Sequence, residues 1–534
     1  MKKNVLALSI ATMIGGLGFA GIAAAGVIVG TNAPLTTSGA TDLQLADGGV
    51  GHMLVVPYFT AQDGNMSVFH VVNSDTVNGK VVKVRFRGAS NSDDILDFQV
   101  YLSPSDVWTA AVSQSATGEA QIQTADTSCT VPRLTPGTPK KFVTNRLKSS
   151  LSDADKANET REGYVELFNV ADVPPTLMVA GAAGTGANKL YDTIKHTSTG
   201  GAPACATSVL ESTAALSNIT DQGVAGTQGF NTPSGGLFGD WYVINVAQTT
   251  TFSGAATAVQ AIGAVNATTG RVHANFVHFP QSAVAVTGTG ANAIGALTAD
   301  PLLSVITAPA TSPAITAAWY DLPDLSTPYV TAPAAGAARD QAGLLTQTLA
   351  ATQVSNQYAT APAISAKTDW VFSMPTRRYS VAYDYTKTGT AGLVFSTLTV
   401  GGVAPVGGQW FNAGNVTVNG TQICTTAANQ QFVDREEQTK TSGAVFSPGE
   451  VSKVQLCGET SVVSFGGSVL GSTVAHSTAS AESHFVNGWG TVSFAAPGVP
   501  LLGAGFTKLT NPQAQTGVSG NYGITWPHRY VRAN

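Results

Sequence analysis

The stretch that decides the fold class reads Lys80-Val-Val-Lys-Val-Arg-Phe86. Its apolar and basic residues alternate, and a period of two is typical of a strand that buries one face and exposes the other. Asn78-Gly79 stands directly before it and favours a tight hairpin turn, because both residues tolerate positive φ. We therefore predict a half-buried strand that forms a hairpin with the apolar run 67–72.

The neighbouring residues repeat this pattern of strands and turns. Residues 53–59 and 96–102 are strand-like, and Asp63-Gly64 is a turn signal. Pro57 predicts a sheet edge or a bulge, because proline cannot donate to a strand ladder. Four strands with tight turns are typical of an antiparallel sandwich of the immunoglobulin-like type. Further strands are predicted at residues 163–169, 239–246, 369–374, 379–383 and 488–494.

The composition agrees with a mainly β chain. Of 534 residues 57 are glycine, 43% are hydrophobic and only 11% are charged, and such chains favour strands joined by turns. We expect antiparallel immunoglobulin-like β-sandwich modules with long Ala/Thr/Gly-rich loops or insertions. The predicted division is an N-terminal sandwich over 26–175, an Ala/Thr/Gly-rich middle region with insertions over 176–366, and a C-terminal β-rich domain over 367–534.

The first 25 residues are typical of a secretory signal peptide. Lys2 and Lys3 precede an apolar run that closes on Ala23-Ala-Ala25, and a basic start, an apolar middle and small residues at the exit define such a signal. We expect cleavage near Ala25 and an extracellular location at the cell surface. A membrane anchor is the alternative, because the run is long enough to span a bilayer.

The four cysteines are candidates for disulfides, since their number is even and the chain is predicted to be exported. They are Cys129, Cys205, Cys424 and Cys457, and three pairings are possible. Proximity in sequence favours Cys129–Cys205 and Cys424–Cys457. Four free thiols are the alternative.

Two groups of carboxylates are candidates for a calcium site. Asp93, Asp94 and Asp97 form one group, and Asp153 and Asp155 form the other. Calcium binds several oxygen ligands, often from Asp residues in loops, so Ca²⁺ is the one candidate cofactor. Solvated turn residues are the alternative at each position.

The sequence holds no catalytic motif. It has no nucleophile elbow, no zinc-binding helix motif and no phosphate-binding loop, so we expect no enzyme activity. The net charge of −5 and the lack of a dense basic stripe argue against a nucleic-acid partner. The locally basic segment 140–148 makes lipopolysaccharide, or the outer-membrane surface, a candidate partner, with a solvated loop as the alternative.

Several segments resemble a group of secreted surface-layer-like proteins of Gram-negative bacteria. The most specific is Ala46-Asp-Gly-Gly-Val-Gly-His-Met-Leu-Val-Val-Pro-Tyr-Phe59. The others are Phe69–Asn73, Val84-Arg-Phe-Arg87, Asp93–Phe98, Tyr101–Thr109, Thr160–Glu166, Asp369–Phe372, Met374-Pro-Thr-Arg-Arg378 and Pro500–Phe506. The resemblance implies an extracellular, non-catalytic protein that assembles into a surface lattice or sheath.

These observations predict a structural protein whose main partner is itself. Low charge limits repulsion between identical copies, and strand edges permit pairing between subunits. An outer-membrane β-barrel of the porin kind and a secreted adhesin are the alternatives. For the adhesin, Trp489 in Gly488-Trp-Gly490 is the candidate sugar platform, although a core anchor is the default role of tryptophan in a sandwich.

Overall fold

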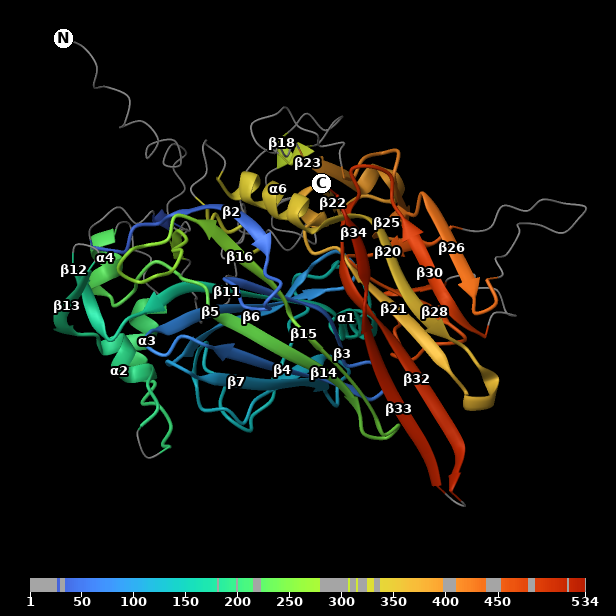
Figure 1. Cartoon of the computed structure of the whole chain (residues 1–534), viewed down its shortest axis with the longest axis horizontal. Helices are drawn as coiled ribbons and strands as arrows, with labels where there is room; N and C mark the ends of the chain where they lie inside the picture. Colours follow the sequence, from blue (N-terminus) through green and yellow to red (C-terminus); the bar gives the residue numbers. More distant parts are fainter. Residues whose placement is uncertain are drawn as a thin grey trace, which may run out of the picture.

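The structure is a computed structural model of the whole chain (Figure 1). It describes residues 26–28, 34–179, 182–197, 200–214, 222–278, 306–307, 314–315, 324–330, 337–396, 410–437, 453–478, 486–515 and 518–533. The predicted signal peptide and part of the predicted middle region lie outside these residues. Within them, none of the helices has the length and apolarity needed to cross a membrane.

The first half of the chain forms two antiparallel sheets. The larger, in spatial order, consists of β2 (Ala40–Leu45), β16 (Thr257–Gly263), β3 (Met53–Thr60), β11 (Glu162–Val173), β5 (Gly79–Gly88), β6 (Asp94–Leu102) and β9 (Cys129–Val131). The smaller consists of β10 (Lys140–Lys141), β8 (Ala120–Gln123), β7 (Val107–Gln114), β4 (Asn65–Asn73), β14 (Leu237–Asn245) and β15 (Thr250–Ala255). Their facing side chains, including Phe69, Phe86 and Trp108, form one core.

The second half forms two more large sheets. One consists of β26 (Asn429–Asp434), β30 (Asn487–Ser493), β20 (Ala350–Ala359) and β31 (Val499–Pro500), and β34 (Arg529–Arg532) also pairs with β20. The other, which we call the shared sheet, consists of β29 (His476–Thr478), β28 (Thr460–Phe465), β21 (Lys367–Ser373), β32 (Leu502–Gln515) and β33 (Val518–Pro527). Within these two sheets the pairing is antiparallel except between β28 and β29.

The shared sheet belongs to two cores at once. Alternate side chains of a strand point to opposite faces, and Trp370 and Phe372 of β21 pack in the core of the second half. Val371, between them, packs in the core of the first half, together with Phe506 of β32. Figure 1 shows this sheet standing between the strands of the first half and the remaining strands of the second.

The smaller elements surround these four sheets. The helices are α1 (Asp153–Glu159), α2 (Lys189–Ile194), α3 (Thr207–Ala214), α4 (Gln222–Thr227) and α6 (Ala337–Leu349), with 3₁₀ turns η2 (Pro362–Ile364), η3 (Arg377–Tyr379) and η4 (Gly389–Gly392). The short strands are β1 (Gly26–Ile28), β12 (Thr176–Val179), β13 (Ala182–Ala187), β17 (Phe276–His278), β18 (Ile306–Thr307), β19 (Ala314–Ile315), β22 (Val381–Tyr383), β23 (Leu393–Ser396), β24 (Val416–Asn419), β25 (Gln422–Thr426) and β27 (Gln455–Cys457).

The mainly β class and the antiparallel sandwich architecture are confirmed, but the predicted hairpin is wrong. β4 and β5 lie in different sheets, so the chain at Asn78-Gly79 crosses from one layer to the other. The Asp75 carboxylate holds this connection by accepting from the backbone N–H groups of Val77 and Asn78. Glycine is required at position 79 for close packing, because a Cβ there would lie 2.8 Å from Ile194 and 2.9 Å from the Leu102 carbonyl oxygen.

Two further predictions about individual strands are resolved by the register. Pro57 lies at a bulge rather than at an edge, because Pro57 and Tyr58 together face Tyr164 where the pairing of β3 with β11 shifts. The strand at residues 80–86 is not half-buried, since every residue of β5 is buried. Strands β14, β15 and β16 complete the first sandwich, which therefore draws on residues as far as 263, in the predicted middle region.

Candidate functional site

The outer face of the larger first sheet carries a group of ions that are buried except for Asp97, whose side chain is 27% exposed. We call this group the buried charge cluster. It consists of Lys83, Arg85 and Arg87 of β5, Asp94 and Asp97 of β6, Glu166 of β11, Asp324 and Arg378. The three β5 side chains have no exposed surface. Removing an ion from water costs several kcal/mol, so buried ions are normally paired with opposite charges.

Strand register brings the cluster together. Arg85 stands opposite Asp97 on β6 and opposite Glu166 on β11, and directly opposed side chains of a sheet are neighbours. The Arg85 guanidinium lies 3.2 Å from Asp97 and 3.5 Å from Asp94. Lys83 also bonds to Asp97. The basic residues that alternate along the strand are therefore matched by acids on both sides.

Two residues from the second half of the chain, Asp324 and Arg378, cover the cluster. The Arg87 guanidinium lies 3.5 Å from Glu166 and 3.9 Å from Asp324, and Arg378 pairs with Asp324 while stacking over Tyr379. Burial raises the pKa of the Glu166 carboxyl, and the positive charges of Arg87 and Arg378 oppose that rise. Because these side chains are enclosed, the cluster is suited to holding the fold together rather than to acting on a solute.

Two of the sequence-predicted calcium ligands belong to this cluster. Asp94 and Asp97 face the basic side chains of β5, and Asp93 accepts a hydrogen bond from Tyr385 Oη at 2.9 Å. Each of the three carboxylates therefore has one oxygen in contact with a donor or a basic group of the protein.

The other two predicted ligands lie on a separate element. Asp153 and Asp155 occupy the first turn of α1, where Ser152 caps the helix by accepting from the Asp155 N–H. Acidic residues there complement the helix dipole. Across the described part of the chain no three His, Cys, Asp or Glu side chains are grouped so that they could hold a metal ion. Calcium binding at either set of acids stays a prediction.

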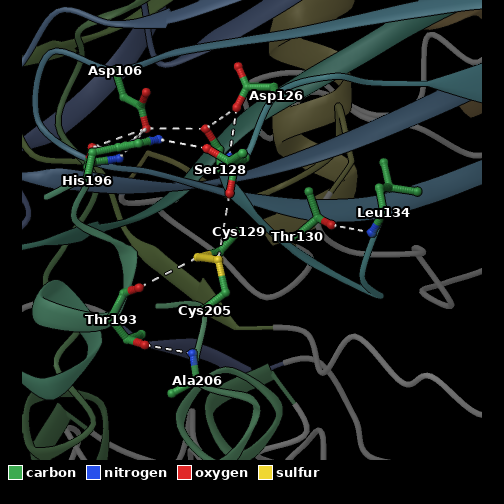
Figure 2. Close-up of a disulfide and its surroundings, with 12 residues drawn as sticks. Asp106, Asp126, Ser128, Cys129, Thr130, Leu134, Thr193, His196, Cys205 and Ala206 are labelled. Carbon is green, nitrogen blue, oxygen red and sulfur yellow. Dashed lines mark hydrogen bonds and ion pairs between the residues drawn. A yellow bond between two sulfur atoms is a disulfide. The ribbon is translucent and has the colours of Figure 1, made fainter. Parts of the chain in front are cut away.

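Both disulfides that proximity favours are present. Cys129 of β9 is bonded to Cys205, just before α3, with an S–S distance of 2.06 Å (Figure 2). Cys424 of β25 is bonded to Cys457 of β27, its in-register partner. Disulfides persist in oxidising compartments, so the pair indicates that the protein folds in such an environment.

A polar group beside the first disulfide was not predicted from the sequence. Figure 2 shows His196 beside Asp106, whose carboxylate also accepts a hydrogen bond from Ser128 Oγ at 3.4 Å. The His196 Nδ1 lies 3.7 Å from the Asp106 carboxylate, and its Nε2 lies 3.4 Å from Thr127 Oγ1. The order acid, imidazole, hydroxyl is that of a hydrolase, but both separations exceed the hydrogen-bond reach that activates a nucleophile. The group ties α2 to the loop before β7.

Two buried carboxylates from different halves hold the same loop. Glu162 of β11 accepts from the backbone N–H groups of Thr473 and Val474 at 2.8 and 3.1 Å. Asp369 of β21 accepts from those of Val469 and Leu470 at 2.9 and 2.8 Å. Burial raises the pKa of Asp369, and these hydrogen bonds oppose that rise. We call this arrangement the carboxylate clamp, because it fastens residues 468–474 between the two sandwiches.

Several segments that are far apart in the sequence meet at these two places. Residues 84–87, 93–98 and 374–378 supply the buried charge cluster, while 160–166 and 369–372 supply the carboxylate clamp. The chain matches no protein-family model, and no curated protein or solved structure is significantly similar to it.

Proposed function

We propose that this chain is a structural, non-catalytic protein of the cell surface that self-assembles into a surface layer or extracellular sheath. The observation that carries the proposal is the burial of many charged side chains. Sixteen charged side chains of the described residues are buried, among them Lys80, Lys83, Arg85, Arg87, Arg377 and Arg378. In a chain with 27 basic and 32 acidic residues, this leaves a surface poor in charge, on which identical copies repel each other weakly.

The connections between the two halves of the chain also support a structural role. The shared sheet, the carboxylate clamp and the two disulfides join the halves and loops into one unit. An extracellular location agrees with the disulfides. The immunoglobulin-like character of the sandwiches stays part of this proposal.

Negative-stain electron microscopy of the purified mature protein tests the proposal. We expect extended sheets or tubes, because a repeated heterologous contact propagates without closing. Adding Ca²⁺ or a chelator shows whether divalent ions link acidic side chains of neighbouring copies. Monodisperse monomers under every condition would contradict the proposal.

A secreted adhesin is a second candidate, favoured by one surface. On the outer face of β30, Trp489 is 46% exposed and stands in register with Gln357 of β20 and Val433 of β26. An aromatic plane beside amide side chains suits stacking and hydrogen bonding to a neutral sugar. A glycan array with wild type and Trp489→Ala tests this, and binding that survives the substitution would remove the surface from consideration.

A further inference from the structure

The shared sheet ends in a strand with one unpaired edge. β33 is ten residues long and pairs with β32; among the described strands no second strand is hydrogen-bonded to its other edge. In Figure 1 the far end of the β32–β33 hairpin extends beyond both sandwiches. A free edge of this kind presents backbone donors and acceptors on which another strand can pair.

The sequence of β33 lacks the charged residues that commonly protect an edge, and its one proline, Pro527, stands at the end of the strand. Val518-Ser-Gly-Asn-Tyr-Gly-Ile-Thr-Trp-Pro527 contains no charged residue, whereas natural edge strands are commonly guarded by lysines, other charges or bulges. Lys508 is the one charged residue of β32, and its ammonium is held at 2.6 Å by Gln248 of the same chain. The hairpin strands are therefore nearly neutral in a chain whose net charge is −5.

One face of β33 is anchored on the first sandwich. A Cβ on Gly523 would lie 2.3 Å from the Thr251 carbonyl oxygen, and Thr525 Oγ1 accepts from the Ser253 N–H at 3.2 Å. The opposite face presents aromatic side chains, with Tyr522 57% and Trp526 38% exposed. The strand is thus held in an extended conformation before any partner arrives, so pairing costs little ordering entropy.

We propose that β33 pairs antiparallel with β33 of a second copy of this chain, about a two-fold axis. Identical edges are self-complementary in such an isologous contact, and the pairing places the exposed aromatic side chains of both copies on one continuous face. The partner is a second copy because the hairpin is nearly neutral. Two chains with a net charge of −5 can meet at this edge without bringing like charges together. This inference rests on the proposed self-assembly and names one of its contacts. A two-fold contact closes on itself, so an extended array also requires a heterologous contact elsewhere on the chain.

Lysine substitutions on the exposed face test the pairing. Tyr522→Lys and Ile524→Lys bring like charges together across the two-fold axis, while Val265→Lys, at a 60% exposed site in the first half, is the matched control. Light scattering over a concentration series measures the dimer dissociation constant, and melting temperature reports folding. We expect unchanged melting and dimerisation weakened by about tenfold or more in the two β33 variants, a factor that corresponds to 1.4 kcal/mol, with Val265→Lys matching wild type.

Hydrogen exchange of the β33 amides gives a second readout. We expect these amides to become protected as the wild-type concentration rises. If wild type assembles while β33 exchanges equally at all concentrations and the lysine variants assemble normally, the pairing is overturned and the layer proposal stands. Wild-type dimers with protected β33 amides but no extended arrays would overturn the layer and support the pairing. Monomers at every concentration would overturn both.

Discussion

The Arg87 guanidinium is buried between Glu166 of a neighbouring strand and Asp324 from the second half of the chain. Removing one member of a buried ion pair leaves its partner charged and unpaired. We therefore expect Arg87→Leu to lower the free energy of unfolding by about 3–5 kcal/mol, measured by urea denaturation. Arg435→Leu is the control, because Arg435 pairs with Glu436 at the surface. Equal effects of both substitutions would show that the buried charge cluster contributes no more than a surface pair.

A second residue-scale prediction concerns pH. The pKa of the Glu159 carboxyl is raised to about 7, first by burial and then by the negative charge of Glu162, although a hydrogen bond from Ser90 opposes the rise. A raised pKa means that this group's contribution to stability is complete below its unfolded pKa of 4.5 and is lost as pH rises through about 7.

Glu159→Gln imitates the protonated state at every pH. We expect the variant to melt at the wild-type temperature near pH 4.5 and above it at pH 8, because only wild type must then bury a charge. Glu436→Gln, at an exposed site, should show no such divergence. A constant difference between Glu159→Gln and wild type across the pH range would rule out this titration as its cause.

At the scale of elements, the two disulfides differ in whether strand pairing also joins the segments that they connect. Cys129–Cys205 closes 76 residues and attaches the region of α2 and α3 to the edge strand β9, whereas Cys424–Cys457 closes 33 residues within a small sheet. Closing a longer loop removes more entropy from the unfolded chain.

We expect the double substitution Cys129→Ser with Cys205→Ser to cost about 4 kcal/mol, measured by chemical denaturation. The matched pair Cys424→Ser with Cys457→Ser should cost about 0.7 kcal/mol less, because the entropy of closing a loop rises with the logarithm of its length. Limited proteolysis should cut the first variant near α3. The reverse order of stability would show that loop closure does not govern these bonds.

At the scale of the whole molecule, the shared sheet should make the two sandwiches unfold together. Phe506 belongs to the second half but contacts the rings of Tyr58, Trp241 and Phe252 in the first. We expect Phe506→Ala to lower the unfolding free energy by about 3–5 kcal/mol and to raise hydrogen exchange in β4 and β28 alike. Tyr522→Ala, at an exposed aromatic, should change neither. Faster exchange confined to β28 would mean that the halves unfold independently.

Local pattern alone determined the strands and the class of fold. Residues 96–102 and 163–169 are strands in the structure, and so are 239–246 and 488–494 except for the last residue of each range. Alternation and turn residues report backbone conformation directly. Cysteine proximity likewise favoured the observed pairings. These are properties of short stretches, and they need no knowledge of what lies across the sheet.

Only the tertiary structure decided what those strands face. The alternation at Lys80–Phe86 predicts that the basic side chains of this strand face solvent. Arg87, the next residue in the alternation, is nevertheless buried, because Asp324 and Arg378, more than two hundred residues later, cover it. Asn78-Gly79 connects two sheets instead of closing a hairpin, since β5 pairs with β6 and β11. Alternation shows which side chains of a strand share a face. Whether that face is buried depends on which distant segment packs on it, and the free energy of the whole fold determines which segment does so.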